Sequence, residues 1–461
     1  MLAWAFALAG KGWKRPLNLY RQASAATGRG SDMLQQLRHL HRRPAQLDNS
    51  LKEPQQQNNG GNLLNRNLIK LRQGWDVICF SNNVEGSFEQ RFATLKSIGE
   101  DRVKERELKS LLKKKPAPVC YVWCDPSPWM HISQVVGSCA DGDMFVMRCS
   151  SVLCGFILVL QGIMKTLSVN KMVRSGCKVK ILMADWFSQM NPEIGGSLNK
   201  MRSIGLYNIE MWKATGMALD QIELVWLSEE ISQHADEYWP LVMDIARRNS
   251  FRRIRKYGGS RDPYPRGELT AAEIFHQCLQ AAVILFQKVD IWLLDMDQDE
   301  ANLSVRQYCR HVKRENKPVA VFHYMLPNLL EHPGMENIRH PAWAFFMEDD
   351  KDDLRFKIEK AFCPPGLAEG NPCLEYIKYI ILPWFGKFEV VRKKENGGKK
   401  TFLSIEELTD DYESGALHSS DLKLALEKSL NKILQPVRDH FRSSAEAKDL
   451  LEAIEEYYIA E

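Results

Sequence analysis

The stretch Val119-Cys120-Tyr121-Val122-Trp123 decides the fold, because it is a short apolar run with prolines before it and the turn-forming pair Asp125-Pro126 after it. Such a run predicts a buried strand. Four further runs of this kind follow, at residues 179–184, 222–227, 291–294 and 319–322. Amphipathic helical patterns separate the runs, at residues 197–215, 228–249 and 270–288. This alternation predicts an α/β fold with a doubly wound parallel sheet covered by helices on both faces.

A smaller, mainly α-helical unit is predicted after residue 360. Prolines at 364, 365 and 372 mark the change, and a hairpin is expected from 388–392 and 400–403 around the turn Asn396-Gly397-Gly398. Helical patterns begin at Ser404 and Ser420. We therefore expect a sheet domain over 83–360 and a C-terminal domain over 361–461.

The N-terminal residues 1–82 do not have the composition of a packed core. Residues 11–43 are basic and almost free of acids, which is typical of an organellar transit peptide, although a disordered extension has the same composition. The Gln/Asn-rich residues 55–62 are expected to be a linker. Folded structure is expected from Ser87, which has capping-box spacing with Gln90.

Composition leaves several classes of partner open. The chain has 461 residues, 44% of them hydrophobic and 26% charged, and its net charge of +4 permits a nucleic-acid partner without requiring one. The eleven cysteines are scattered and lack the spacing of metal ligands, so we expect free thiols in a reducing compartment and no metal site.

Several motifs point to one family. They are Cys120-Tyr121 with Asp125-Pro126-Ser127 and Met130-His131-Ile132-Ser133-Gln134, then Ala184-Asp185-Trp186-Phe187, Met296-Asp297-Gln298, Glu369-Gly370-Asn371-Pro372-Cys373 and Asp411-Tyr412-Glu413-Ser414-Gly415. In kind and order they resemble eukaryotic, plant-type tyrosine–tRNA ligases, which are class I aminoacyl-tRNA synthetases. The resemblance covers about residues 87–457.

The resemblance implies a Rossmann-like catalytic domain followed by an anticodon-binding domain. It also implies ATP-dependent activation of L-tyrosine to tyrosyl-adenylate, with Mg²⁺, and transfer of tyrosine to tRNA(Tyr) for translation. The expected partners are thus tRNA(Tyr), L-tyrosine and ATP, with a homodimer as the assembly, a cytoplasmic location and no membrane contact. An organellar location is the alternative if the basic leader is a transit peptide.

The resemblance also assigns candidate site residues. His131 and Gln134 occupy the family's first catalytic motif, where an imidazole at a helix start suits a triphosphate. Tyr121, Gln280, Asp297 and Gln298 lie where the family binds tyrosine. In the C-terminal domain, Lys423, Lys428, Lys432 and Arg438 are candidates for phosphate contact, or equally for a solvated helix face.

The chain departs from the family pattern at other positions. Trp123 stands in place of a glycine and Trp129 in place of an arginine. His276 replaces a tyrosine, and Val283 replaces the aspartate that reads the substrate hydroxyl. The second motif, at residues 335–339, has lost both family lysines, and Ile338 lies within it. These changes fill the predicted nucleotide-binding site or remove positive charge from it, whereas nucleotide chemistry needs a site that is open and cationic.

Residues 135–161 form a segment that the family lacks, since its members continue from the equivalent of Gln134 directly to that of Gly162. Its apolar run at 152–160 is too short to span a membrane. We interpret the segment as an insertion, with a retained in-frame intron as the hypothesis for its origin. Two functions therefore stay open: a tyrosine–tRNA ligase, or an inactive relative that keeps tRNA binding or dimerisation.

Overall fold

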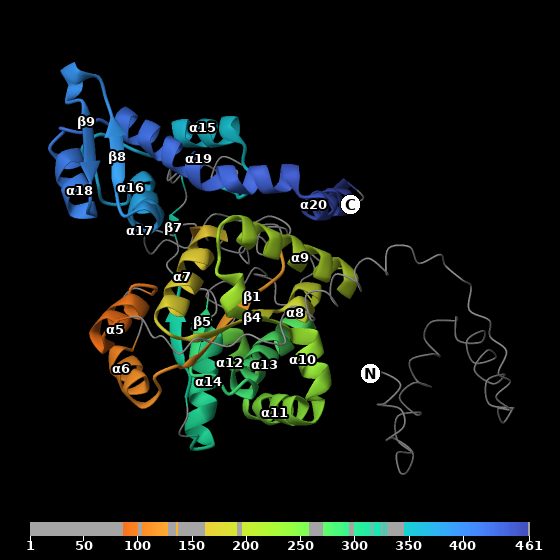
Figure 1. Ribbon diagram of the computed structural model, residues 1–461. Coiled ribbons are helices and arrows are strands. Elements are labelled where there is room, and N and C mark those ends of the chain that lie inside the picture. Colours follow the sequence, from red (N-terminus) through yellow and green to blue (C-terminus); the bar gives the residue numbers. More distant parts are fainter. Residues whose placement is uncertain are drawn as a thin grey trace, which may run out of the picture. The chain divides into compact units, whose positions relative to one another are not determined.

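The computed structural model describes residues 86–99, 104–127, 135–136, 162–190, 196–257, 271–294, 299–314, 317–323, 326–327, 329 and 345–459 (Figure 1). The expected leader, the linker and most of the insertion lie outside these residues. Within the described parts, no helix is both long and apolar enough to cross a membrane.

A five-stranded parallel sheet forms the centre of the fold, in the order β4-β3-β1-β5-β6. All five predicted strands are confirmed, with ends that differ by at most one residue. They are β1 (Val119–Cys124), β3 (Lys178–Met183), β4 (Ile222–Trp226), β5 (Ile291–Leu294) and β6 (Val319–Phe322). Strands β1, β5 and β6 are apolar along their length because side chains on both of their faces are buried, as expected of a parallel sheet. Strands β3 and β4 have charged residues near their starts, Lys178, Lys180 and Glu223, and are buried towards their carboxyl ends.

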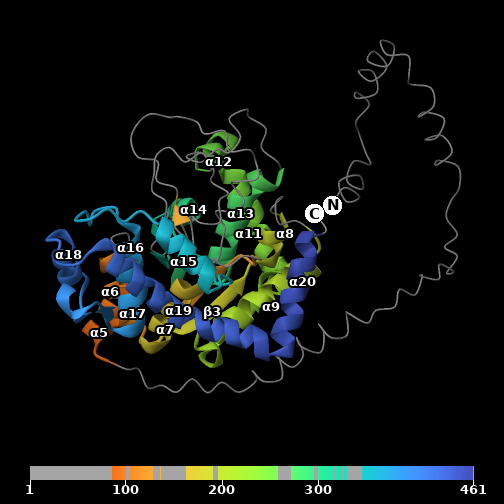
Figure 2. The ribbon, with the colours of Figure 1, turned by 90° about the horizontal axis from the view of Figure 1, so that it is seen from above.

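Helices cover the sheet, as predicted. They are α7 (Gly162–Arg174), α8 (Asp185–Met190), α9 (Leu198–Ala214), α10 (Leu227–Gln233), α11 (Ala235–Arg248), α12 (Phe251–Tyr257), α13 (Ala271–Phe286) and α14 (Asp299–His311). Helix α7 packs on β3, and α13 packs between α11 and α14 (Figure 2). The single helix expected over 228–249 is wrong: the backbone leaves the helical range at His234, which separates α10 from α11.

Shorter elements precede and link these parts. Helix α5 (Phe88–Lys96) begins at the predicted capping box of Ser87 and Gln90, and α6 (Glu105–Lys114) follows it. The first two residues of the expected insertion form β2 (Val135–Val136), which pairs with β7 (Leu326–Pro327).

The C-terminal region is mainly helical, and its predicted hairpin is confirmed. It comprises α15 (Lys351–Lys360), α16 (Pro372–Tyr376), a π-helical turn (Ile377–Ile381), α17 (Leu382–Phe385), β8 (Phe388–Val391), β9 (Lys399–Phe402), α18 (Ile405–Glu413), α19 (Ser419–Ser443) and α20 (Ala445–Ile459). Gly397 and Gly398 both have positive φ, which the turn between β8 and β9 requires. Helix α15 lies before the boundary expected at residue 361 but packs against α19, and α20 packs against α9.

Candidate active site

The central strand β1 presents its aromatic side chains at the end of the sheet where such folds bind ligands. Tyr121 and Trp123 alternate along the strand and therefore point to the same face. Both side chains are buried, and the neighbouring strand β5 places Trp292 in register with Tyr121. The rings of Tyr121 and Trp292 meet edge to face, with centroids 5.5 Å apart.

Helix α13 and the residue after it supply the other candidate residues on this face of the sheet. His276, Gln280, Val283 and Gln287 recur every three or four positions, which places them along one side of the helix. Gln280 and Val283 are buried. The predicted tyrosine-site residues Tyr121 and Gln280 thus lie in the same layer as the two departures His276 and Val283.

An aromatic column joins these two elements. The rings of Trp292 and Trp123 have centroids 6.1 Å apart, Trp123 meets Phe187 at 5.0 Å, and Phe187 meets His276 at 5.0 Å. The last two contacts are edge to face, the geometry that aromatic quadrupoles favour. Burial lowers the pKa of His276 to about 4, so its ring is neutral at physiological pH.

Trp123 is held at both its polar and apolar ends. Only 1% of the residue is exposed, and its indole Nε1 donates a hydrogen bond to Asp125 Oδ2 at 2.8 Å. The following residues are fixed by Asn208 of α9, whose Nδ2 donates to Ser127 O at 2.7 Å and whose Oδ1 accepts from Ser127 N at 3.2 Å. These hydrogen bonds therefore fix Trp123 and Ser127 at the start of the first predicted motif.

Tyr121 makes its polar contact within the protein. Its hydroxyl donates to Gln287 Oε1 at 2.7 Å, and burial raises the pKa of the phenol. Gln287 Nε2 is buried and has no hydrogen-bond partner among the described residues. Val283, one helical turn before Gln287, has no polar side-chain atom.

Two buried polar residues near the end of β1 escaped the sequence prediction. Lys165 of α7 is completely buried, and its Nζ donates to Trp123 O at 2.6 Å. His323 directly follows β6 and lies 3.3 Å from Ser168 Oγ through Nδ1. Burial and the nearby Lys165 hold the pKa of His323 well below its usual value. Two sequence features could have identified these residues: Lys165 lies among apolar residues of a helix, and His323 follows a strand at its carboxyl end.

The remaining candidates lie outside the described residues. These are His131 and Gln134, predicted to be catalytic, Asp297 and Gln298, predicted to bind tyrosine, and the departures Trp129 and Ile338. Within the described residues, His, Cys, Asp and Glu side chains nowhere gather in a group of three or more that could hold a metal ion.

The segment that follows the second motif is anchored by buried polar contacts. Lys357 Nζ and Asp349 Oδ1 are 2.5 Å apart, with side chains 5% and 7% exposed. Tyr207 of α9 donates to Glu348 Oε1 at 2.9 Å. Arg438 of α19 donates from two nitrogens to Asp349 O, at 2.9 and 2.7 Å.

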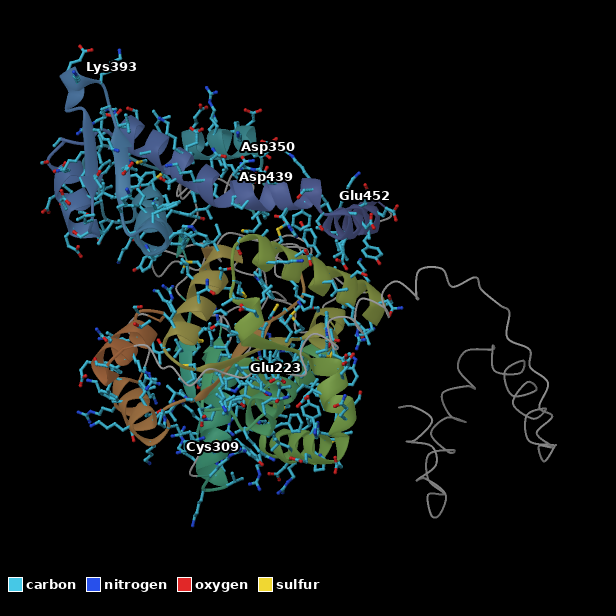
Figure 3. The ribbon with its side chains drawn as sticks, in the orientation of Figure 1. Glu223, Cys309, Asp350, Lys393, Asp439 and Glu452 are labelled. Carbon is cyan, nitrogen blue, oxygen red and sulfur yellow. The ribbon has the colours of Figure 1, made fainter. Side chains whose placement is uncertain are left out.

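These contacts change the interpretation of the basic residues on α19. Arg438 donates to Asp349, and Lys423 donates to Glu359 O at 3.1 Å, so both have structural partners. Lys428 and Lys432 are exposed one helical turn apart. Exposed lysines also lie at the hairpin of β8 and β9, where Lys393 projects at the tip (Figure 3).

Comparison with known proteins agrees with this architecture. The sequence profile of "tRNA synthetases class I (W and Y)" matches residues 159–435. The chain is 47% identical over 371 residues to tyrosine–tRNA ligase 1, cytoplasmic, of Arabidopsis thaliana, a match that covers 80% of this chain and 89% of the relative. It is 46% identical to tyrosine–tRNA ligase 2, cytoplasmic, of the same plant, with 80% of this chain and 46% of that relative covered.

A solved structure gives the same result. The tyrosyl-tRNA synthetase of Leishmania major in complex with tyrosinol matches with a TM-score of 0.69 and 34% identity, over 81% of this chain and 53% of that one. The chain thus spans about half the length of the Leishmania protein and of the second Arabidopsis ligase. The parallel sheet, the helical C-terminal region and these matches together show that the chain belongs to the class I tRNA synthetases (W and Y), and within them to the plant-type tyrosine–tRNA ligases.

Proposed function

We propose that this chain acts as a tyrosine–tRNA ligase, which activates L-tyrosine with ATP and transfers it to tRNA(Tyr) in the cytoplasm. The observation that carries the proposal is that Tyr121 on the central strand β1 and Gln280 on α13 are both present and both buried. The names of the Arabidopsis relatives support both the reaction and the compartment.

The proposed reaction depends on the positioning of its two substrates more than on proton transfer. Attack of the tyrosine carboxylate on the α-phosphate of ATP needs the two groups in line and needs stabilisation of the pyrophosphate. We assign tyrosine binding to Tyr121, Gln280, Asp297 and Gln298, and contact with ATP to His131 and Gln134. Mg²⁺, which the family resemblance implies, would enter with the phosphates of ATP.

The second candidate is a relative without tyrosine activation, and the aromatic column favours it. The Trp123 indole packs between Trp292 and Phe187 and takes up space that a glycine would leave open above the sheet. Val283 cannot pair with a substrate hydroxyl, and an unpaired buried hydroxyl costs about 1–3 kcal/mol. In this candidate the protein keeps tRNA binding or dimerisation and does not activate tyrosine.

Tyrosine-dependent pyrophosphate exchange separates the two candidates. The assay compares the parent chain, Trp123→Gly, and a chain that lacks residues 135–161. The ligase proposal expects exchange above background in the parent and more in the shortened chain. Exchange at background in all three, with tRNA binding retained, would leave only the second candidate. Exchange that appears only in Trp123→Gly would identify the indole as the block.

We also propose that the C-terminal domain, residues 361–461, contacts tRNA. The exposed Lys393 and Lys394 of the hairpin and Lys428 and Lys432 of α19 support this proposal. Neutralising phosphate contacts releases counterions, so Lys428→Gln/Lys432→Gln should weaken tRNA binding and flatten its salt dependence by about two units of slope at most. Lys423→Gln is the matched control, because its Nζ is engaged with Glu359 O. Equal losses in both variants would refute the assignment.

A homodimer completes the proposal. The described surface exposes large apolar side chains on α13 and on the two helices that pack against it, namely Phe275 of α13, Met243 of α11 and Phe251 of α12. Exposed large apolar side chains on neighbouring helices are typical of an interface between subunits. Sedimentation of Phe251→Asp/Phe275→Asp should show a monomer where the parent is a dimer; a parent that sediments as a monomer would refute the assembly.

A further inference from the structure

An amide side chain meets the phenol of Tyr121 just after the end of helix α13. The Tyr121 hydroxyl donates a hydrogen bond to Gln287 Oε1, with the two oxygens 2.7 Å apart. Tyr121 belongs to the central strand β1, and its ring is buried in the apolar core that this strand shares with α13. The bond therefore holds the amide of Gln287 at the tip of a residue that is proposed to bind tyrosine.

The nitrogen of the same amide is left without an acceptor. Gln287 Nε2 is buried and makes no hydrogen bond with the described residues. Buried donors in folded proteins rarely stay unpaired, because each one has lost its hydrogen bonds to water. The Tyr121 oxygen, for its part, has lone pairs that can accept a further hydrogen bond. A donor and an acceptor thus lie side by side, since Nε2 and Oε1 of Gln287 share one carbon atom.

The position of Gln287 along the chain relates this amide to the other residues proposed to bind tyrosine. Gln287 lies two helical turns after Gln280 and one turn after Val283, on the same side of α13 and its extension. Val283 has no polar side-chain atom. Gln287 is therefore the residue after Gln280 on this side that can form hydrogen bonds with a substrate.

We propose that Gln287 selects the phenol hydroxyl of L-tyrosine in this chain. The substrate hydroxyl donates to Tyr121 Oη, Tyr121 donates to Gln287 Oε1, and Gln287 Nε2 donates to the substrate oxygen. Every donor of this network then has an acceptor, whereas L-phenylalanine leaves the amide nitrogen unpaired. The assignment rests on the proposed function, since it takes the tyrosine site to lie beside Tyr121.

Equilibrium binding of amino acids to the full-length chain tests the proposal without any catalytic step. Isothermal titration calorimetry should show that the parent binds L-tyrosine at least about tenfold more tightly than L-phenylalanine. In Gln287→Met this preference should fall below about threefold, through weaker binding of L-tyrosine and unchanged or tighter binding of L-phenylalanine. Gln277→Met is the matched control, because Gln277 lies on another side of the same helix, and it should keep the preference of the parent.

A third amino acid tests the direction of the hydrogen bonds on the parent alone, whether or not a variant folds. 4-Amino-L-phenylalanine carries N–H donors in place of the hydroxyl and is a poorer acceptor. It leaves Gln287 Nε2 without a good partner and should bind at least about fivefold more weakly than L-tyrosine. Equal binding of these two amino acids would show that no donor of the protein recognises the hydroxyl, and would overturn the proposal.

The outcomes separate this proposal from the ligase reaction. A parent without a preference for L-tyrosine, or a Gln287→Met variant that keeps the preference of the parent, would overturn the assignment of Gln287. Pyrophosphate exchange by the parent alongside either result would leave the ligase function standing. Selective binding of L-tyrosine that depends on Gln287, without exchange, would support the assignment and refute the reaction instead.

Discussion

The buried ion pair between Lys357 and Asp349 allows a quantitative prediction. Its two side chains are almost completely buried, and Asp349 Oδ2 also accepts from Phe346 N at 2.9 Å. Lys357→Met keeps the length of the side chain but leaves the carboxylate without a counterion. Breaking a buried pair on one side costs about 3–5 kcal/mol, so we expect a loss of that size in the free energy of unfolding at neutral pH.

The pH dependence of this loss follows from the pKa of Asp349. Burial raises that pKa and Lys357 partly lowers it again. When the pKa of a carboxyl is higher in the folded state than in the unfolded state, the folded state loses stability as the pH rises through the folded pKa. Lys357→Met raises the folded pKa further. The loss should therefore be largest at neutral pH and shrink as acid protonates Asp349.

Urea unfolding at about pH 7.5 and about pH 5 measures both effects. Lys360→Met is the matched control, since Lys360 is exposed on the same helix and should change stability by less than about 0.5 kcal/mol. Adding Asp349→Asn to Lys357→Met should recover a large part of the loss. A loss no greater than that of the control, or one that is equal at both pH values, would refute the reasoning.

Three further predictions concern other contacts. A Cβ on Gly205 would lie 2.6 Å from the Trp226 ring, so Gly205→Ala should lower the free energy of unfolding by about 1–3 kcal/mol, and an unchanged urea midpoint would contradict this packing. Arg306 lowers the pKa of the half-exposed Glu107. At pH values above the usual carboxyl pKa, Arg306→Met should therefore lower the free energy of unfolding by less than about 1 kcal/mol. In acid, urea unfolding should show no difference from the parent. Burial depresses the pKa of His276, so the folded state loses stability as the pH falls from about 6.5 towards 4. His276→Gln should reduce the fall of the thermal unfolding midpoint over this pH range. Parallel curves of midpoint against pH for the variant and the parent would count against this prediction.

Local sequence was sufficient for the elements of the fold. Each strand of the sheet is a short apolar run between turn-forming residues, and this pattern is readable without knowledge of distant contacts. The same holds for the capping box at Ser87 and for the glycines of the C-terminal hairpin, because caps and turns depend on the backbone of a few adjacent residues. The break at His234 was missed, since residues 228–249 keep a helical pattern across it.

The partners of the site residues depended on contacts between distant parts of the chain. The resemblance to the family predicted that Trp123 replaces a glycine, but only the folded chain brings Trp123 against Phe187, whose ring in turn contacts His276. Likewise, Arg438 belongs to a basic helix in sequence and donates to Asp349 in the structure. The periodicity of the sequence indicates which face of a helix or strand is buried. Which residues lie against that face depends on how the helices and strands pack, and packing brings together residues that are far apart in the chain.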